Sequence, residues 1–296
     1  MEKAAIIGYG KLGSHLYHAL KKSGKYSIGL VVKSSRSSPG KNALKDCSLI
    51  FITVNDSNIT RTARTISRLP IDFRDKIVFH TSGALTAEIL SPLIRKGASA
   101  ASFHPVQTFE KKAVKKHTKF EKIYIAVEGQ DKAVKKAFEV AKHIGSNPFV
   151  LSPGDKVLHH INCVIASNYL VSYINKLSKL NERITGTYRD KWMHNNGFKK
   201  GNFFSIYKPL IEQTLENIRT KGTKASLTGP IQRKDVQTIK VHLEKLRKEL
   251  PEVLNFYSYM GIETVRLAVK NKYFSSKEGE KLIRLFKRSN IKGVNK

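Results

Sequence analysis

Cysteine, tryptophan and acidic residues are scarce in this chain of 296 residues. Its two cysteines, Cys47 and Cys163, lie far apart and make no metal spacing, so we expect no disulfide framework and predict no metal site. No apolar run approaches the length of a membrane span, and the chain begins with a strand-like segment instead of a basic, apolar leader. These absences predict a protein of the reducing cytoplasm that neither enters a membrane nor is exported.

The shortage of acid leaves 23 Asp and Glu against 54 Lys and Arg, a formal net charge of +31. Such a charge suggests a polyanionic partner, above all nucleic acid. The cations are mostly Lys, however, and they are spread over both halves without a helix-turn-helix, a zinc spacing or an RNA-binding aromatic signature. One run on an expected exposed helix face comprises Lys111, Lys112, Lys115, Lys116 and Lys119. Nucleic-acid binding therefore stays a minor alternative.

A glycine-rich turn near the N-terminus is the most informative feature. The apolar run Ala4–Ile7 suits a buried parallel strand, and Ser14–Lys21 carries apolar residues at helical spacing. Between them, Gly8 allows a tight turn, Gly10 lets a pyrophosphate approach the backbone, and Gly13 lets helix and strand pack closely. The helix N-terminus would supply amide N–H groups to the phosphates. The alternative is a plain tight turn. The predicted dinucleotide contacts here are Gly8, Tyr9, Gly10, Lys11, Leu12 and Gly13.

The segment after the next expected strand, Ser27–Val32, bears on the choice of cofactor. A free ribose 2′-OH usually meets an Asp or Glu about twenty residues past the glycines, and no acid stands here. The positions hold Lys33, Ser34, Ser35 and Arg36 instead, which suit a 2′-phosphate. The pattern favours NADP over NAD. The alternative is that Lys33 and Arg36 are solvated loop charges.

The rest of the chain alternates and then becomes helical. Further strands are expected at 48–54, 76–79, 98–103, 123–127 and 148–151, with helices at 57–69, 86–96 and 131–144. This alternation predicts an α/β fold, a Rossmann-type and mostly parallel sheet in residues 1–152. Residues 153–296 are predicted to form an all-helical domain, with helices at 155–184, 205–220, 234–249, 252–270 and 276–288.

Ligands of such sheets lie outside the carboxyl ends of the strands, so the residues that follow each strand are candidates. Val54 and Asn55 end one strand and, with Ser82 after the next strand, are predicted to contact the cofactor. Two further loops, 80–85 and 102–109, set histidine, hydroxyl and amide groups beside Gly or Pro; they hold His80, Ser82, His104 and Gln107. The alternative is that these groups cap helices and satisfy backbone atoms.

Polar exceptions mark the long apolar helix predicted at 155–184. His160 and Asn168 are eight positions apart, which places them on adjacent parts of one helix face about two turns apart. Ser167 and Asn168 would be costly to bury without partners. They are candidate site residues, and the alternative is that they are satisfied polar groups of the helix packing.

An ordered series of motifs resembles a known family. IIGYGKLG, HTSGAL, SFHPVQTF, HHINCVIASNYLV, PLIEQTLENI and LTGPIQRKD span most of the chain. Together they resemble the Rossmann-like family whose C-terminal half is a helical domain of unknown function. That family is related to ketopantoate reductase, 6-phosphogluconate dehydrogenase and the deazaflavin-dependent NADP reductases. The resemblance implies an NAD(P)-binding oxidoreductase that forms a homodimer through its helical domain.

The resemblance also implies positions around a cleft. Beside the three glycines, it places His80, Ser82, His104, Gln107, His160 and Asn168 there. The segment 228–231 with Arg233 and Asp235 matches a motif of the second domain, although Lys234 stands where the family has Gly. Residues 188–203 depart from the family pattern as a basic insertion that holds the only tryptophan, Trp192.

These observations lead to a hypothesis of hydride transfer between NADPH and a carbonyl or imine of a small, anionic substrate held between the domains. His160 would donate the proton, because imidazole titrates near neutral pH, and Asn168 would orient the substrate. Ser82 and His104 would complete the polar wall. Arg233 would bind a substrate carboxylate, or pair with Asp235. The alternatives are a non-catalytic NADP sensor and a basic nucleic-acid-associated protein.

Overall fold

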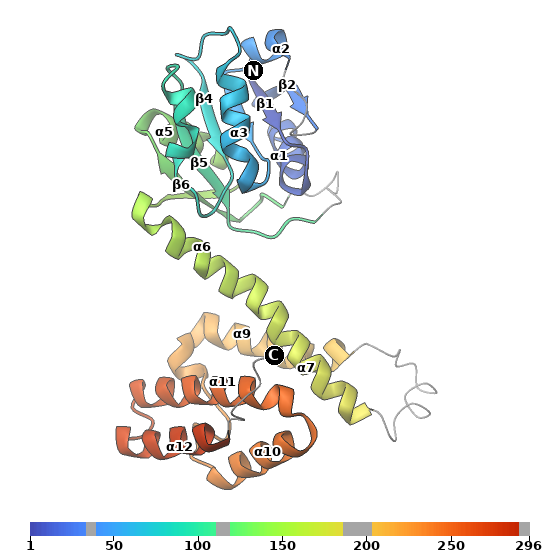
Figure 1. Cartoon of the computed structure of the whole chain (residues 1–296), viewed down its shortest axis with the longest axis vertical. Coiled ribbons are helices and arrows are strands. Elements are labelled where there is room, and N and C mark those ends of the chain that lie inside the picture. The colour runs from blue at the N-terminus through green and yellow to red at the C-terminus, as the bar shows by residue number, and fades with distance from the viewer. Residues whose placement is uncertain (34–39, 111–118, 186–202, 290–296) are drawn as a thin grey trace. The chain divides into compact units, whose positions relative to one another are not determined.

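The computed structural model of this chain describes residues 1–33, 40–110, 119–185 and 203–289 (Figure 1). Its internal contacts divide the chain into two units, Met1–Leu170 and Val171–Lys296. This division lies inside the long helix, later in the chain than the predicted boundary at residue 152. Among the described residues, no helix is both long and apolar enough to cross a membrane.

The first unit is built on one sheet of seven strands. In chain order they are β1 Glu2–Ile7, β2 Tyr26–Val32, β3 Leu49–Ile52, β4 Ile77–His80, β5 Ser99–Pro105, β6 Tyr124–Gly129 and β7 Asn147–Val150. Their order across the sheet is β2-β1-β3-β4-β5-β6-β7, and all neighbours are parallel except β5 and β6. The predicted Rossmann-type, mostly parallel sheet is therefore confirmed.

The strand order reverses direction at β1. The chain passes from β1 to β2 on one side, then returns to place β3 on the other side. The connections after β1 and β3 consequently run to opposite faces of the sheet, and a crevice opens between the two strand ends. Such a switch point is where open α/β sheets bind their ligands.

Both faces of the sheet are covered by helices, as Figure 1 shows. One face packs on α1 Lys11–Lys22 and α5 Asp131–His143, the other on α3 Asp56–Ser67 and on α4 Ser91–Ile94 with the 3-10 turn η1 Ala87–Leu90. A short helix, α2 Lys41–Lys45, follows β2. The strands alternate accordingly: Ile6 and Phe51 face α1, while Ile7 and Ile52 face α3.

One expected helix of this unit is wrong in kind. The segment 86–96 forms the 3-10 turn η1 followed by the single helical turn α4. Pro92 lies in the first turn of α4, and its missing amide hydrogen cannot continue the hydrogen-bond ladder of the turn before it. The spacing of apolar residues gives no sign of this interruption.

The long helix predicted at 155–184 is confirmed, with one irregular turn. It follows the 3-10 turn η2 Pro153–Asp155 as α6 Lys156–Val164, a π-helical turn η3 Ile165–Tyr169, and α7 Leu170–Thr185. Ser167 Oγ donates to the Cys163 carbonyl at 2.6 Å, a side-chain bond that competes with the helical ladder. π turns of this kind are frequent at functional sites.

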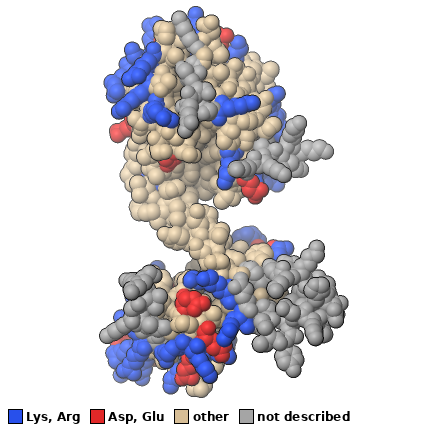
Figure 2. All heavy atoms as spheres, turned by 45° about the vertical axis from the view of Figure 1, so that its right-hand side comes forward, with Lys and Arg blue, Asp and Glu red and all other residues tan. Residues whose placement is uncertain are grey.

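The second unit is helical, as predicted. It contains α7 and then α9 Phe203–Ser226, α10 Val236–Glu249, α11 Pro251–Lys270 and α12 Ser276–Ser289. Gly222 leaves the helical conformation with φ 71° and kinks α9. The core lies between α10, α11 and α12, and Gly261 lets the Phe286 ring approach the backbone of α11. On the face of the molecule drawn in Figure 2, Lys and Arg side chains are spread over both units, in agreement with the dispersed positive charge expected from the sequence.

Candidate functional site

Two of the three glycines of the N-terminal turn are required by the fold itself. Gly8 has φ 109°, in the region that favours glycine, and a Cβ there would lie 2.8 Å from the Thr53 backbone. A Cβ on Gly13 would lie 2.0 Å from the carbonyl oxygen of Gly8. Gly10 differs, because its backbone (φ −80°, ψ −157°) suits any residue and its Cβ would meet no atom within 4 Å. Packing within the fold therefore gives no reason for glycine at position 10.

Gly10 opens on a cavity of about 850 Å³ at the switch point between β1 and β3. Its lining residues are Tyr9, Gly10, Lys11, Leu12, Ser14, Thr53, Val54, Asn55, Asp56 and Thr81. The predicted contacts Tyr9–Leu12, Val54 and Asn55 are thus brought together. Gly10 is also the N-cap of α1, whose first turn carries no acid, so the amides at this end favour an anion. The volume and position suit a dinucleotide.

Of the predicted 2′-phosphate contacts, Lys33 alone lies among the residues that the structure describes. Lys33 is exposed at the end of β2, directly after Val32, whose carbonyl accepts from the Gly8 amide at 2.9 Å. Lys33 is therefore next to the glycine turn in the sheet. Ser34, Ser35 and Arg36 lie outside the described residues, as does Trp192.

His80 is committed to its own loop. It is fully buried, its Nε2 donates to the Thr86 carbonyl at 3.1 Å, and its Nδ1 accepts from the Ser82 amide at 3.2 Å. Burial, then the charge of Lys156, lowers the pKa of His80 to about 3, so the ring is neutral near pH 7. Both nitrogens are occupied, which gives His80 a structural role.

Ser82 links that loop to the cofactor cavity. Its Oγ donates to Asp56 Oδ2 at 2.6 Å and accepts from the amides of Ala84 and Leu85 at 3.2 and 3.1 Å. Asp56 lines the cavity. Because three partners already use the Ser82 hydroxyl, it fixes the loop that follows β4, beside the place where a cofactor would lie.

Lys156, in the first turn of α6, is the central cation of the site. It is fully buried, and its Nζ donates to the Ser82 carbonyl at 3.1 Å and to Ser102 Oγ at 2.7 Å. Burial lowers its pKa to about 8, a shift that the carboxylates of Glu128 and Asp56 oppose. Lys156 therefore ties the loop that follows β4 to strand β5, which contains Ser102.

Sequence reasoning missed Lys156 and Glu128. Nothing distinguishes Lys156 among 54 cations except its place at the start of an apolar helix, where a cation is unfavourable. Glu128 lies in β6, and the only signal in the sequence is that an acidic residue stands in an otherwise largely apolar strand. Its Oε2 accepts from the Ala87 amide at 2.9 Å, and burial raises its pKa.

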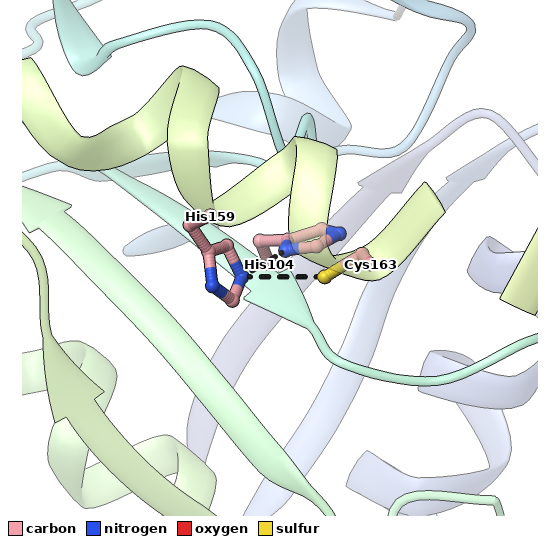
Figure 3. Close-up of side chains that lie close together, drawn as sticks. All are labelled: His104, His159 and Cys163. Carbon is pink, nitrogen blue, oxygen red and sulfur yellow. Dashed lines mark hydrogen bonds between the residues drawn. The ribbon is translucent and has the colours of Figure 1, made fainter. Parts of the chain in front are cut away.

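Three histidines and a cysteine gather where β5 meets α6. His104 Nδ1 lies 3.3 Å from His159 Nε2, which lies 3.6 Å from Cys163 Sγ (Figure 3). Burial, then Lys156, lowers the pKa of His104 to about 3 and also lowers that of His159. The backbone of Gly83 packs against two of these rings. A Cβ on Gly83 would lie 2.6 Å from His160 Nδ1 and 2.8 Å from His104 Nε2.

His160 Nδ1 is buried and meets no hydrogen-bond partner among the described residues. An imidazole nitrogen left in this way costs free energy unless a bound molecule satisfies it. His160 is therefore the predicted catalytic residue whose placement most directly suggests a ligand.

Two predicted residues of this unit are not drawn into the cluster. Asn168 is exposed on the π turn, and its side-chain amide lies 2.9 Å from Ser167 Oγ. The π turn between His160 and Asn168 changes the angle that a regular helix would set between them. Gln107 is exposed, and its Oε1 accepts from the Thr108 amide at 2.8 Å.

The predicted motif of the second unit surrounds the start of α10. Arg233 is exposed, and Asp235 caps the helix by accepting from the Thr238 amide at 3.0 Å and its hydroxyl at 2.7 Å. Lys234, where the family has Gly, has φ 58°, and its Nζ donates to Glu278 at 3.0 Å. A cavity of about 470 Å³ here is lined by Lys234, Val236, Lys240, Glu278, Lys281, Leu282, Arg284, Leu285 and Arg288.

Comparison with known proteins fits this architecture. A Rossmann-like domain model matches residues 2–105, and the model of a domain of unknown function, DUF2520, matches residues 123–264. No curated protein matches this chain.

Solved structures share the fold over nearly the whole chain. A protein from Thermotoga maritima is 21% identical with a TM-score of 0.59, covering 97% of this chain and 98% of its own. Pyrroline carboxylate reductase from Plasmodium falciparum, with NADP bound, is 12% identical with a TM-score of 0.55, covering 96% and 98%. An imine reductase from Myxococcus stipitatus in complex with NADP+ is 12% identical with a TM-score of 0.54, covering 97% and 93%. At these identities the likeness shows the shared fold.

Proposed function

We propose that this chain, a Rossmann-like domain followed by a DUF2520 domain, is an NADP-dependent oxidoreductase acting on a carbonyl or imine of a small, anionic substrate. The observation that carries the proposal is the cavity at the β1/β3 switch point, onto which Gly10 opens. That two solved structures of the same fold, both reductases, hold NADP supports it.

The residues present fit a dinucleotide. The amides at the start of α1 would hold the pyrophosphate, with Gly10 leaving the space that a side chain would fill. Lys33 and Arg36 would take the 2′-phosphate, which selects NADPH over NADH. When bound, the nicotinamide supplies the hydride.

The chain's own residues would handle the substrate. His160, with its buried and unpartnered Nδ1, would hydrogen-bond the carbonyl oxygen or imine nitrogen and provide the proton as negative charge develops there. Lys156 is a positioning residue, because it holds the loop after β4 through the Ser82 carbonyl and strand β5 through Ser102. Asn168, Gln107 and Arg233 stay predicted substrate contacts.

The test is a calorimetric titration of the full chain with NADPH and with NADH. Gly10→Val places a side chain in the open space without straining the backbone, so we expect binding at least about tenfold weaker in a protein that still folds. Gly40→Val is the matched control, because Gly40 also has an ordinary backbone and open space at its Cβ. Equal NADPH binding by the wild type and Gly10→Val would contradict the assignment of the cavity at Gly10 as the cofactor site.

The same titration separates the cofactors and the functions. Lys33→Ala with Arg36→Ala should weaken NADPH binding and leave NADH binding unchanged. Keto acids and imines are then screened for turnover with His160→Ala as the comparison. Tight NADPH binding without turnover of any of them would favour the non-catalytic sensor, and no binding of either cofactor would refute both functions.

We also propose that the chain forms a homodimer through its helical unit. Large apolar side chains are exposed along two helices of that unit: Val171 and Tyr173 in α7, and Phe204, Ile206, Leu210, Leu215 and Ile218 in α9. Exposed apolar residues in such number favour a protein interface. A second copy of the chain, presenting the same surface, would cover them.

A further inference from the structure

We propose that His104, His159 and Cys163 form a binding site for Zn²⁺. Each offers one ligand atom, and no two of these atoms are more than 4.8 Å apart. The three residues are partly exposed, so an ion can reach them. The sequence predicts no metal because His104 lies 55 residues before His159, and the spacing becomes local only when β5 and α6 meet.

The separations fit a tetrahedral zinc ion. Zn–N bonds of about 2.0 Å and a Zn–S bond of about 2.3 Å at tetrahedral angles place two nitrogens about 3.3 Å apart, and a nitrogen and a sulfur about 3.5 Å apart. The distances from His159 Nε2 are 3.3 Å to His104 Nδ1 and 3.6 Å to Cys163 Sγ. The third separation, between His104 and Cys163, is the one that an ion would adjust.

The elements that carry the ligands hold them in place. His159 and Cys163 are four residues apart on α6, so they project from the same face one turn apart, and Figure 3 shows both beside His104. His104 lies in β5, followed by Pro105, whose ring restricts the backbone of the residue before it. Nitrogen and thiolate ligands together are the donor set that zinc prefers.

Three protein ligands leave a fourth position of the ion for a water or for an oxygen or nitrogen atom of a small molecule. Sites with three protein ligands are those in which zinc takes part in chemistry, whereas structural sites are closed by four. This site does not depend on the proposed cofactor, since none of its ligands lines the cavity at Gly10. The two proposals can therefore fail separately.

The competing explanation is a hydrogen-bonded group without an ion. Between His104 and His159 one nitrogen would carry the proton and donate it, and the Cys163 thiol would contact His159 weakly. Binding of a metal to the full chain, measured without any assay of activity, distinguishes the two.

The first experiment adds Co²⁺ to the metal-free wild-type chain under reducing conditions. A tetrahedral site with one thiolate gives strong visible d–d bands and a near-ultraviolet thiolate-to-cobalt charge-transfer band, saturating at one equivalent and displaced by Zn²⁺. Absence of the charge-transfer band overturns the proposal, whatever the variants do.

The second experiment measures Zn²⁺ affinity against a chromophoric chelator. We expect Cys163→Ser and His159→Gln each to weaken binding at least about 100-fold, because each removes a ligand. Cys47→Ser is the matched control, since Cys47 is the other cysteine, is buried and contacts the Ala43 carbonyl. Wild-type affinity in Cys163→Ser, or an equal loss in Cys47→Ser, would refute the site.

Discussion

The burial of Lys156 has a consequence for stability that can be measured. Its pKa is about 8 in the folded chain and 10.5 in its ordinary state, which we take for the unfolded chain. Between these values the unfolded chain keeps the proton that the folded chain has released. Stability therefore rises with pH across this interval. At about 1.4 kcal/mol for each pH unit of separation, the full gain is about 3.5 kcal/mol, and most of it, about 3 kcal/mol, falls between pH 8 and pH 10.5.

Lys156→Met removes the charge while keeping most of the side-chain volume. The lost hydrogen bonds to Ser82 and Ser102 change stability by an amount that does not depend on pH. The difference in unfolding free energy, wild type minus Lys156→Met, should therefore rise by about 3 kcal/mol between pH 8 and pH 10.5. Lys135→Met, at an exposed position of α5, is the control and should show no such rise.

Urea unfolding of the three proteins, followed by circular dichroism at several pH values in this interval, measures the difference directly. Two histidines whose pKa values Lys156 lowers do not imitate the effect, because His80 and His104 have pKa values of about 3 and stay neutral throughout the interval. A difference in unfolding free energy that stays constant from pH 8 to pH 10.5 would refute the conclusion that burial lowers the pKa of Lys156.

Three further predictions concern the turn, the second unit and the dimer. Gly13→Ala should lower the unfolding free energy measured in urea by about 2–3 kcal/mol, because the new Cβ meets the carbonyl oxygen of Gly8. Gly10→Ala should lower it by less than about 0.5 kcal/mol, because its Cβ meets no atom within 4 Å. Equal effects would contradict the packing at Gly13. Lys234→Gly should be about 1 kcal/mol more stable than Lys234→Ala in urea unfolding. Both variants lose the ion pair with Glu278, and only alanine keeps a Cβ at the positive φ of 58°. Equal stability would show that the backbone relaxes at this position. Leu210→Glu should convert a dimer to a monomer in sedimentation. Glu212→Lys, at an exposed position two residues on and therefore on the opposite side of the helix from Leu210, should leave the dimer intact. A monomeric wild type would refute the dimer.

The fold could be predicted because its signals are local. The apolar runs of β1 and β3 are buried on both faces of a parallel sheet, and such runs can be read directly from the sequence. The turn at Gly8–Gly13 could also be predicted, since one short segment supplies the whole strand–turn–helix unit. The exceptions have local causes too small for periodicity to reveal. Pro92 interrupts an expected helix, and the π turn alters the angle between His160 and Asn168.

The site was predicted only in part, because most of its polar groups acquire their roles from partners distant in sequence. The hydroxyl of Ser82 was expected to face a ligand, yet it is used by Asp56, 26 residues earlier, and by its own loop. Lys156 lies 74 residues from the carbonyl to which it donates. No pattern within a short window can show which of many lysines is buried by such contacts.

That contrast assigns different tasks to the predicted and the unpredicted residues. At the glycine turn that the sequence identifies, Gly8 and Gly13 allow close backbone packing, and Tyr9, Gly10, Lys11 and Leu12 line the cavity at the switch point. Three of the residues that sequence reasoning missed, Lys156, His159 and Cys163, lie in α6, and a fourth, Glu128, lies in β6. Helix α6 thus supplies, from one short segment, both the cation that joins the loop after β4 to β5 and two of the three ligand atoms of the proposed metal site. Insertion of one residue just before Lys156 would displace both sets of side chains, whereas the glycine turn, in a different part of the chain, would keep its geometry.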